Sequence, residues 1–89
     1  MRHDSFYELH TKTDCNWCKK AIQLCIDKKL KYAIFSYDNC KPKILNEIKE
    51  EFQWKTIPIV VAYDGTERKF IGGYTDFEEH LSLPKANTS

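Results

Sequence analysis

The sequence predicts an α/β fold: a mixed four-stranded sheet with three helices, in the order β-α-β-α-β-β-α. Short segments rich in β-branched and aromatic residues alternate with segments of helical periodicity in the first half of the chain. Asp64-Gly65, a hairpin turn signal, follows the third β-rich segment. Strands joined by a crossover helix run parallel and strands joined by a tight turn run antiparallel, so the sheet is expected to be mixed.

The first strand is expected at Phe6 to His10, bounded on both sides by polar residues. Thr13 or Asp14 is then expected to cap a helix of about four turns that runs on from Trp17. The apolar residues that recur every three or four positions in this helix are Cys18, Ala21, Ile22, Cys25 and Ile26.

The second strand is expected at Leu30 to Tyr37, which is rich in aromatic and aliphatic residues. Pro42 fits the first turn of a second helix, where its missing N–H is not needed. The apolar residues expected on the buried face of this helix are Ile44, Leu45, Ile48 and Phe52.

The third strand is expected at Ile57 to Tyr63 and its hairpin partner at Lys69 to Ile71. The last helix is expected from about Thr75 to Leu83, because Thr75 and Glu78 match a capping box. Its apolar stripe consists of Phe77 and Leu81.

The length of 89 residues predicts one domain, residues 1–89, with 84–89 as a flexible tail. Lys and Arg number 14 against 13 Asp and Glu, so bulk charge selects neither a nucleic acid nor a membrane surface as partner. No stretch approaches the roughly 18 apolar residues of a membrane span, and no apolar signal peptide follows Met1. We expect a monomer in the reducing cytoplasm.

Cys15 and Cys18 form a C-x-x-C pair where the loop after the first strand enters the first helix. Backbone N–H groups and the macrodipole stabilise an anion at a helix N-terminus, so Cys15 is expected to be partly thiolate and to attack disulfides. Cys18, one turn further, is the expected resolving thiol. Lys12 adds positive charge and Asp14 opposes it, and we expect the positive contributions to dominate because an exposed carboxylate is screened.

Half of a zinc site is the alternative use of this pair. Zinc needs two further ligands, whereas the sequence has no second C-x-x-C and three scattered histidines, so we expect no metal. Cys25 lies about 10.5 Å along the helix from Cys18, which is beyond disulfide reach, so we expect it in the core. Cys40 lies in the loop before Pro42, and the sequence offers it no partner.

Three separated motifs resemble the glutaredoxin family of the thioredoxin superfamily, and the resemblance runs from Phe6 to Leu83. They are Lys12-Thr13-Asp14-Cys15-Asn16-Trp17-Cys18, then Thr56-Ile57-Pro58, then Ile71-Gly72-Gly73-Tyr74-Thr75-Asp76-Phe77. The resemblance implies a thioredoxin-like fold, a dithiol site of C-N-W-C type and a cis bond before Pro58.

The resemblance also implies an activity: glutathione-dependent reduction of protein disulfides and of protein–glutathione mixed disulfides. Cys15 and Cys18 would be the catalytic thiols, glutathione the reducing substrate, and ribonucleotide reductase an electron acceptor. The implied glutathione-binding residues are Lys12, Trp17, Thr56, Ile57, Pro58, Gly73, Tyr74, Thr75 and Asp76.

Each implied contact has a physical rationale. The backbone of Ile57 would pair with the extended cysteinyl part of glutathione, and Gly73 would allow close backbone approach. The helix start at Thr75 and Asp76 would hold the γ-glutamyl group, while Lys12 would meet the glycyl carboxylate. The residues expected to wall the groove are Trp17 and Tyr74.

Other interpretations stay open for several of these residues. Taken singly, Thr75 and Asp76 fit a helix cap equally well, Pro58 fits a turn, and Trp17 fits a partly exposed aromatic side chain. Asn16 stands where the family has proline, which leaves the redox potential and the capacity for an iron–sulfur cluster open.

Two alternative functions therefore stand beside the enzyme. One is a non-enzymatic carrier, in which Cys15 from two subunits and two glutathiones hold an iron–sulfur cluster. The other is a glutaredoxin-like redoxin that is reduced by thioredoxin reductase.

Overall fold

The structure is a computed structural model that describes residues 6–63 and 65–82. Its elements are β1 (Phe6–Thr11), α1 (Asn16–Asp27), β2 (Tyr32–Ser36), α2 (Pro42–Glu51), β3 (Ile59–Tyr63), β4 (Arg68–Gly72) and α3 (Tyr74–Ser82). The strands form one sheet in the order β2-β1-β3-β4. β1 pairs with β2 in parallel, and β3 is antiparallel to both β1 and β4. The predicted mixed four-stranded sheet with three helices is confirmed.

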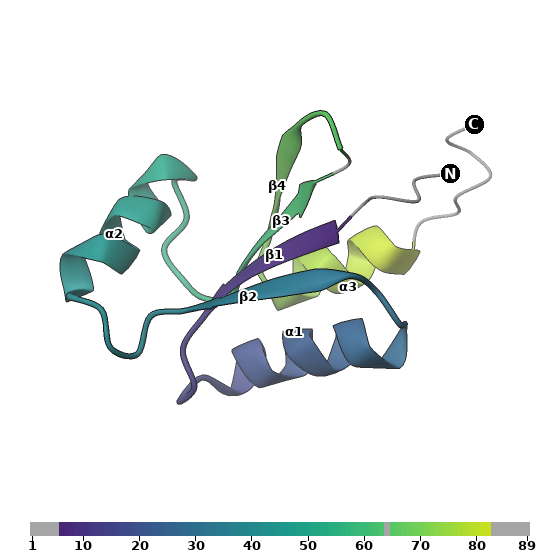
Figure 1. The fold of residues 1–89 in the computed structure, drawn as a ribbon, viewed down its shortest axis with the longest axis horizontal. Coiled ribbons are helices and arrows are strands. Elements are labelled where there is room, and N and C mark those ends of the chain that lie inside the picture. Colours follow the sequence, from purple (N-terminus) through teal and green to yellow (C-terminus); the bar gives the residue numbers. More distant parts are fainter. Residues whose placement is uncertain (1–5, 64, 83–89) are drawn as a thin grey trace.

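Helices α1 and α3 cover one face of this sheet (Figure 1). Between them and the sheet lies a cluster of fully buried side chains contributed by both helices and by the two central strands: Leu9, Ala21, Cys25, Val60 and Phe77. Cys25 is therefore a core residue, as predicted. The predicted stripe of α3 is also confirmed, since Phe77 is fully buried and Leu81 packs against the cluster.

Helix α2 lies beside the sheet, away from the layer formed by α1 and α3 (Figure 1). Its predicted buried face is only partly confirmed: Leu45 is buried, whereas the Ile44 side chain is 39% exposed. The segment that leaves α2 is anchored to β4 instead, because Phe52 stacks on Phe70 at 5.1 Å and Trp54 meets the edge of the same ring at 5.2 Å.

The first helix begins later than its polar flank predicts. Its N-cap is Cys15 rather than Thr13 or Asp14, because the Cys15 sulfur accepts the backbone N–H of Cys18. Pro42 does occupy the first turn of α2, as predicted. Within the described residues, no helix is long and apolar enough to cross a membrane.

The predicted capping box of the last helix is wrong. Because α3 begins at Tyr74, Thr75 lies inside the helix, and the cap is made by another pair. The Asp76 carboxylate accepts the backbone N–H of Gly73 at 3.2 Å, which satisfies a donor just before the first turn.

Several strand ends also differ from the prediction. β2 is shorter than Leu30 to Tyr37, and β3 starts at Ile59, after Pro58, rather than at Ile57. Asp64 of the hairpin signal, Leu83 and the predicted tail lie outside the described residues.

Candidate active site at the start of helix α1

The two thiols of the C-x-x-C pair differ in environment. Cys15 is half-buried at the N-cap of α1, where its sulfur accepts the Cys18 backbone N–H at 3.1 Å. This hydrogen bond directs a backbone donor of the first helical turn at the Cys15 sulfur. Cys15 is therefore placed to act as an accessible nucleophile.

Cys18 is fully buried one turn further along α1. Burial, followed by the hydrogen bond with Cys15, raises the pKa of Cys18 to about 12, although a backbone N–H of Lys12 lowers it in part. At neutral pH Cys18 is therefore a protonated thiol.

The second motif lies directly against Cys15. The peptide bond between Ile57 and Pro58 is cis, and the Cys15 thiol donates to the Ile57 carbonyl oxygen at 3.8 Å. The backbone just before β3 therefore lies beside the Cys15 sulfur. Pro58 is buried, whereas Thr56, two residues earlier, is exposed.

The third motif meets the second at Gly73. A methyl group added to Gly73 would lie 3.7 Å from the Pro58 carbonyl oxygen and 3.8 Å from the Trp54 indole. Gly73 thus brings the start of α3 against the cis-proline segment. Trp54 was not predicted to lie here.

Two aromatic side chains, Trp17 in the C-x-x-C segment and Tyr74 at the start of α3, contact each other. The ring of Trp17 is 53% exposed and lies 5.6 Å from the ring of Tyr74, between centroids. Lys20 adds a cation on the same ring, with its Nζ 4.6 Å from the Trp17 centroid. An aromatic pair with one exposed ring and a neighbouring ammonium group favours a ligand that has an apolar part and an anionic group.

Three predicted binding residues remain: Asp76 and Thr75 in the third motif, and Lys12 in the first. Asp76 is half-buried and already accepts the Gly73 N–H, so its structural role as a cap is established. Thr75 is exposed in the first turn of α3, and Lys12 is half-buried between β1 and α1. The described residues contain no cluster of three or more ligands suited to a metal ion.

Asp38, which was not among the predicted residues, contacts the loop that carries the first motif. Its carboxylate accepts the backbone N–H of Thr13 at 2.9 Å and the Thr13 hydroxyl at 3.1 Å. The parallel pairing of β1 and β2 is the signal that could have found it. The carboxyl ends of parallel strands lie at the same sheet edge, so the loops after them meet.

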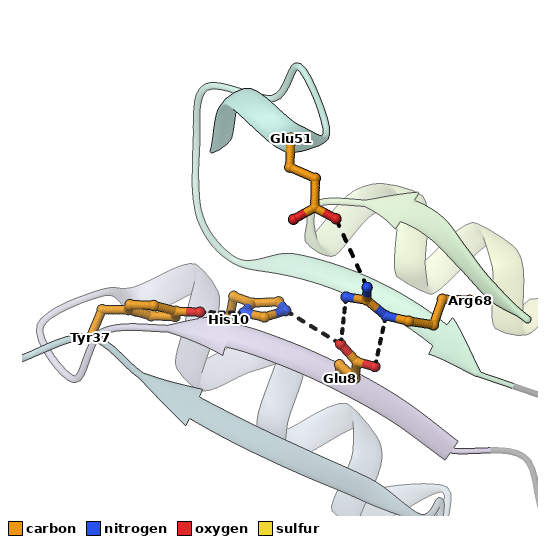
Figure 2. A network of polar contacts seen from close by, with 5 residues as sticks. All are labelled: Glu8, His10, Tyr37, Glu51 and Arg68. Carbon is orange, nitrogen blue, oxygen red and sulfur yellow. Dashed lines mark hydrogen bonds and ion pairs between the residues drawn. The ribbon is translucent and has the colours of Figure 1, made fainter. Parts of the chain in front are cut away.

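A network of polar side chains lies on the sheet face opposite α1 and α3 (Figure 2). His10, only 5% exposed, bonds through Nδ1 to the Tyr37 hydroxyl at 2.7 Å, and its Nε2 lies 3.6 Å from Glu8 Oε1. Arg68 pairs with the same Glu8 carboxylate and, at 3.9 Å, with Glu51. This network connects the end of β2 with the end of α2 across the sheet.

Cys40 is exposed in the loop between β2 and α2. The four cysteines are free thiols in this structure. By burial the four cysteines divide into one accessible and one buried thiol at the start of α1, one core thiol and one surface thiol.

The fold is similar to those of known redox proteins. Glutaredoxin 1 from Francisella tularensis, solved with cacodylate, superposes with a TM-score of 0.70 at 18% identity, covering 96% of this chain and 99% of that one. NrdH-redoxin from Escherichia coli, described as a glutaredoxin-like protein with a thioredoxin-like activity profile, superposes with a TM-score of 0.61 at 14% identity. That match covers 89% of this chain and 96% of the redoxin.

A search of curated protein sequences found no match to this chain. The sequence model of the Glutaredoxin family, in contrast, matches residues 8–66, which include the C-x-x-C pair and the cis-proline segment. The chain therefore belongs to the glutaredoxin family of thiol oxidoreductases.

Proposed function

We propose that the protein is a dithiol glutaredoxin that uses glutathione to reduce protein disulfides and protein–glutathione mixed disulfides. The observation that carries this proposal is the asymmetry of the two thiols. Cys15 is accessible and accepts a helix N–H, whereas Cys18 is buried with a raised pKa. A nucleophile and a resolving thiol need these two environments.

In the first half-reaction, the Cys15 thiolate attacks one sulfur of the substrate disulfide and releases the other as a thiolate. Cys18 then loses its proton and attacks the Cys15 sulfur, which releases the second substrate thiolate and forms the Cys15–Cys18 disulfide. Two molecules of glutathione restore the dithiol: the first forms a mixed disulfide with Cys15, and the second releases glutathione disulfide. Two electrons pass from two glutathiones to one substrate disulfide.

The described surroundings of Cys15 support a glutathione site. The Ile57 backbone beside the sulfur would pair with the cysteinyl unit, and Trp17 with Tyr74 would flank it. Asp76 at the start of α3 would receive the γ-glutamyl ammonium while it keeps its bond to Gly73, and Lys12 would receive the glycyl carboxylate.

The test is glutathione-coupled reduction of two substrates, a protein disulfide and a protein–glutathione mixed disulfide. Cys15→Ser is expected to abolish both activities. Cys18→Ser is expected to retain reduction of the mixed disulfide and to lose reduction of the protein disulfide. Cys40→Ser, which changes an exposed thiol outside the site, is the matched control. Full activity of Cys15→Ser would refute the mechanism.

The similarity to a glutaredoxin-like redoxin with a thioredoxin-like activity profile favours one second candidate, reduction by thioredoxin reductase. Parallel assays with glutathione plus glutathione reductase and with thioredoxin reductase distinguish the two. Turnover only with thioredoxin reductase would replace the glutathione proposal. Ribonucleotide reductase is proposed as an electron acceptor on the family resemblance, and reduction of its disulfide in the same assay tests this.

A further inference from the structure

Asp38 ties the loop before Cys15 to the end of β2. One oxygen of its carboxylate accepts both donors of Thr13, the backbone N–H at 2.9 Å and the hydroxyl at 3.1 Å. The other oxygen accepts the Ser36 hydroxyl. Thr13 stands directly between Lys12 and Asp14 in the segment that leads into Cys15.

The segment that bears Asp38 is itself well anchored. The Tyr37 N–H donates to the Thr11 carbonyl at 3.0 Å, which continues the parallel pairing of β1 and β2 by one further bond. The Tyr37 hydroxyl bonds to the nearly buried His10 at 2.7 Å. Asp38 therefore holds Thr13 from a position directly after Tyr37, a residue bonded to β1 through both its backbone and its side chain.

The carboxylate is ionised at neutral pH. Its bonds with Ser36 and with the Thr13 N–H, and more weakly the charge of Lys12, lower the pKa of Asp38. An ionised carboxylate only accepts hydrogen bonds, and the partners here, Thr13 and Ser36, all donate to it. The Asp38 carboxylate therefore meets only hydrogen-bond donors in these contacts, as an ionised carboxylate requires.

We propose that Asp38 is a positioning residue that acts through Thr13: it holds the loop so that the Lys12 ammonium attracts anionic reactants toward Cys15. The proposal deepens the proposed function and rests on it where the anionic reactant is glutathione. The attraction itself applies to any small anion that reacts with the Cys15 sulfur, which allows a test without glutathione.

Two variants separate the charge of Asp38 from its hydrogen bonds. Asp38→Asn and Asp38→Ala both remove the negative charge, but only asparagine keeps a carbonyl oxygen that accepts from Thr13. The difference between these two variants therefore measures the positioning contact alone. Asp27→Ala is the matched control, because Asp27 is also exposed and accepts one side-chain bond, from Gln23 at 2.9 Å, at the far end of α1.

The measurement is the rate of alkylation of Cys15 by iodoacetate, an anion, relative to iodoacetamide, its neutral analogue, at low ionic strength. Modification of Cys15 is followed by peptide mass spectrometry in a Cys40→Ser background. We expect the iodoacetate to iodoacetamide ratio in Asp38→Ala to fall about 1.4- to fivefold below that in Asp38→Asn, the range that an exposed ion pair allows. Asp27→Ala is expected to match the unsubstituted protein.

Equal ratios in Asp38→Ala and Asp38→Asn would overturn the proposal, even if both variants were less stable. A second measurement links the residue to glutathione: reduction of the Cys15–Cys18 disulfide by glutathione, relative to reduction by uncharged 2-mercaptoethanol. We expect the same ordering of the variants. An altered alkylation ratio without any preference for glutathione in the unsubstituted protein would count against the proposed function and support the role of Asp38.

Discussion

Arg68 on β4 reaches across β3 to Glu8 on β1, with Nε 3.1 Å from one carboxylate oxygen and Nη2 3.0 Å from the other (Figure 2). The pair links two strands that are not neighbours in the sheet. The Glu8 side chain is 12% exposed and that of Arg68 is 44% exposed. The pKa of Arg68 is raised, mainly because its side chain donates hydrogen bonds to Glu8.

We expect a double-mutant cycle with Glu8→Gln and Arg68→Gln to give a coupling free energy of unfolding of about 0.5–1 kcal/mol. The two-bond geometry favours the upper part of this range, while the exposure of Arg68 and screening by salt reduce it. Urea unfolding of the four proteins at low and high salt measures the coupling. A coupling of zero at low salt would show that the pair contributes nothing to stability.

His10 makes stability depend on pH. Burial is the main cause that lowers the pKa of His10, and the neighbouring Glu8 opposes it in part. Because the unfolded chain takes up a proton near pH 6.5 and the folded protein does so only at lower pH, stability should fall as pH drops below about 6.5 toward the lower pKa of folded His10. The groups that face the ring are Glu8, Phe35, Tyr37 and, by charge, Arg68 and Glu51.

Urea unfolding at pH 7.5 and pH 5.5 checks this expectation against two variants. His10→Gln should lose less stability on acidification than the unsubstituted protein does, because its side chain does not titrate. His80→Gln, a change at an exposed position on α3, should retain the full loss. Equal losses in all three proteins would show that His10 is not responsible.

Gly72 and Gly73 are neighbours with different tolerance for a side chain. Gly72 has φ +131°, and a methyl group there would lie 2.5 Å from an Asp76 carboxylate oxygen. Gly72→Ala should therefore cost about 1–3 kcal/mol and displace Asp76 from its bond to Gly73. Gly73→Ala is the matched comparison, since its nearest new contact is 3.7 Å; it should cost less than about 1 kcal/mol.

Thermal unfolding together with the glutathione KM of the two alanine variants tests this difference. Gly72→Ala is expected to lower stability more than Gly73→Ala does. It is also expected to raise the KM for glutathione, because it displaces Asp76. If Gly73→Ala were the more destabilised protein, the assignment of the strained backbone to Gly72 would be wrong.

The cysteines should react with iodoacetamide at pH 8 in an order set by exposure. Cys15 and Cys40 should be modified first, because one is half-buried and the other exposed. Cys18 and Cys25 are fully buried, and burial raises their pKa values to about 12 and about 11, so they should react only on unfolding. Timed labelling with peptide mass spectrometry distinguishes the four, and native labelling of Cys25 at the rate of Cys40 would contradict the core assignment.

Local sequence patterns were sufficient for the element order. Three patterns depend only on neighbours in the chain: the helical spacing around Ala21 and Cys25, the β-branched residues at Ile59 to Val61, and the turn at Gly65. The predicted cap, Thr13 or Asp14, differs from the observed cap Cys15 by one or two residues, because several polar side chains in this loop could cap the helix. Only the folded geometry shows that the Cys15 sulfur itself accepts the Cys18 N–H.

The sequence by itself determined the order of elements, the C-x-x-C pair at a helix start and the core position of Cys25, since these follow from spacing along one element. The tertiary structure decided which distant residues meet: Ile57 against Cys15, Asp38 against Thr13, and Arg68 against Glu8. Such contacts depend on strand order and on the side of the sheet that each loop reaches. Those properties arise from packing between elements, and no spacing within a single element encodes them.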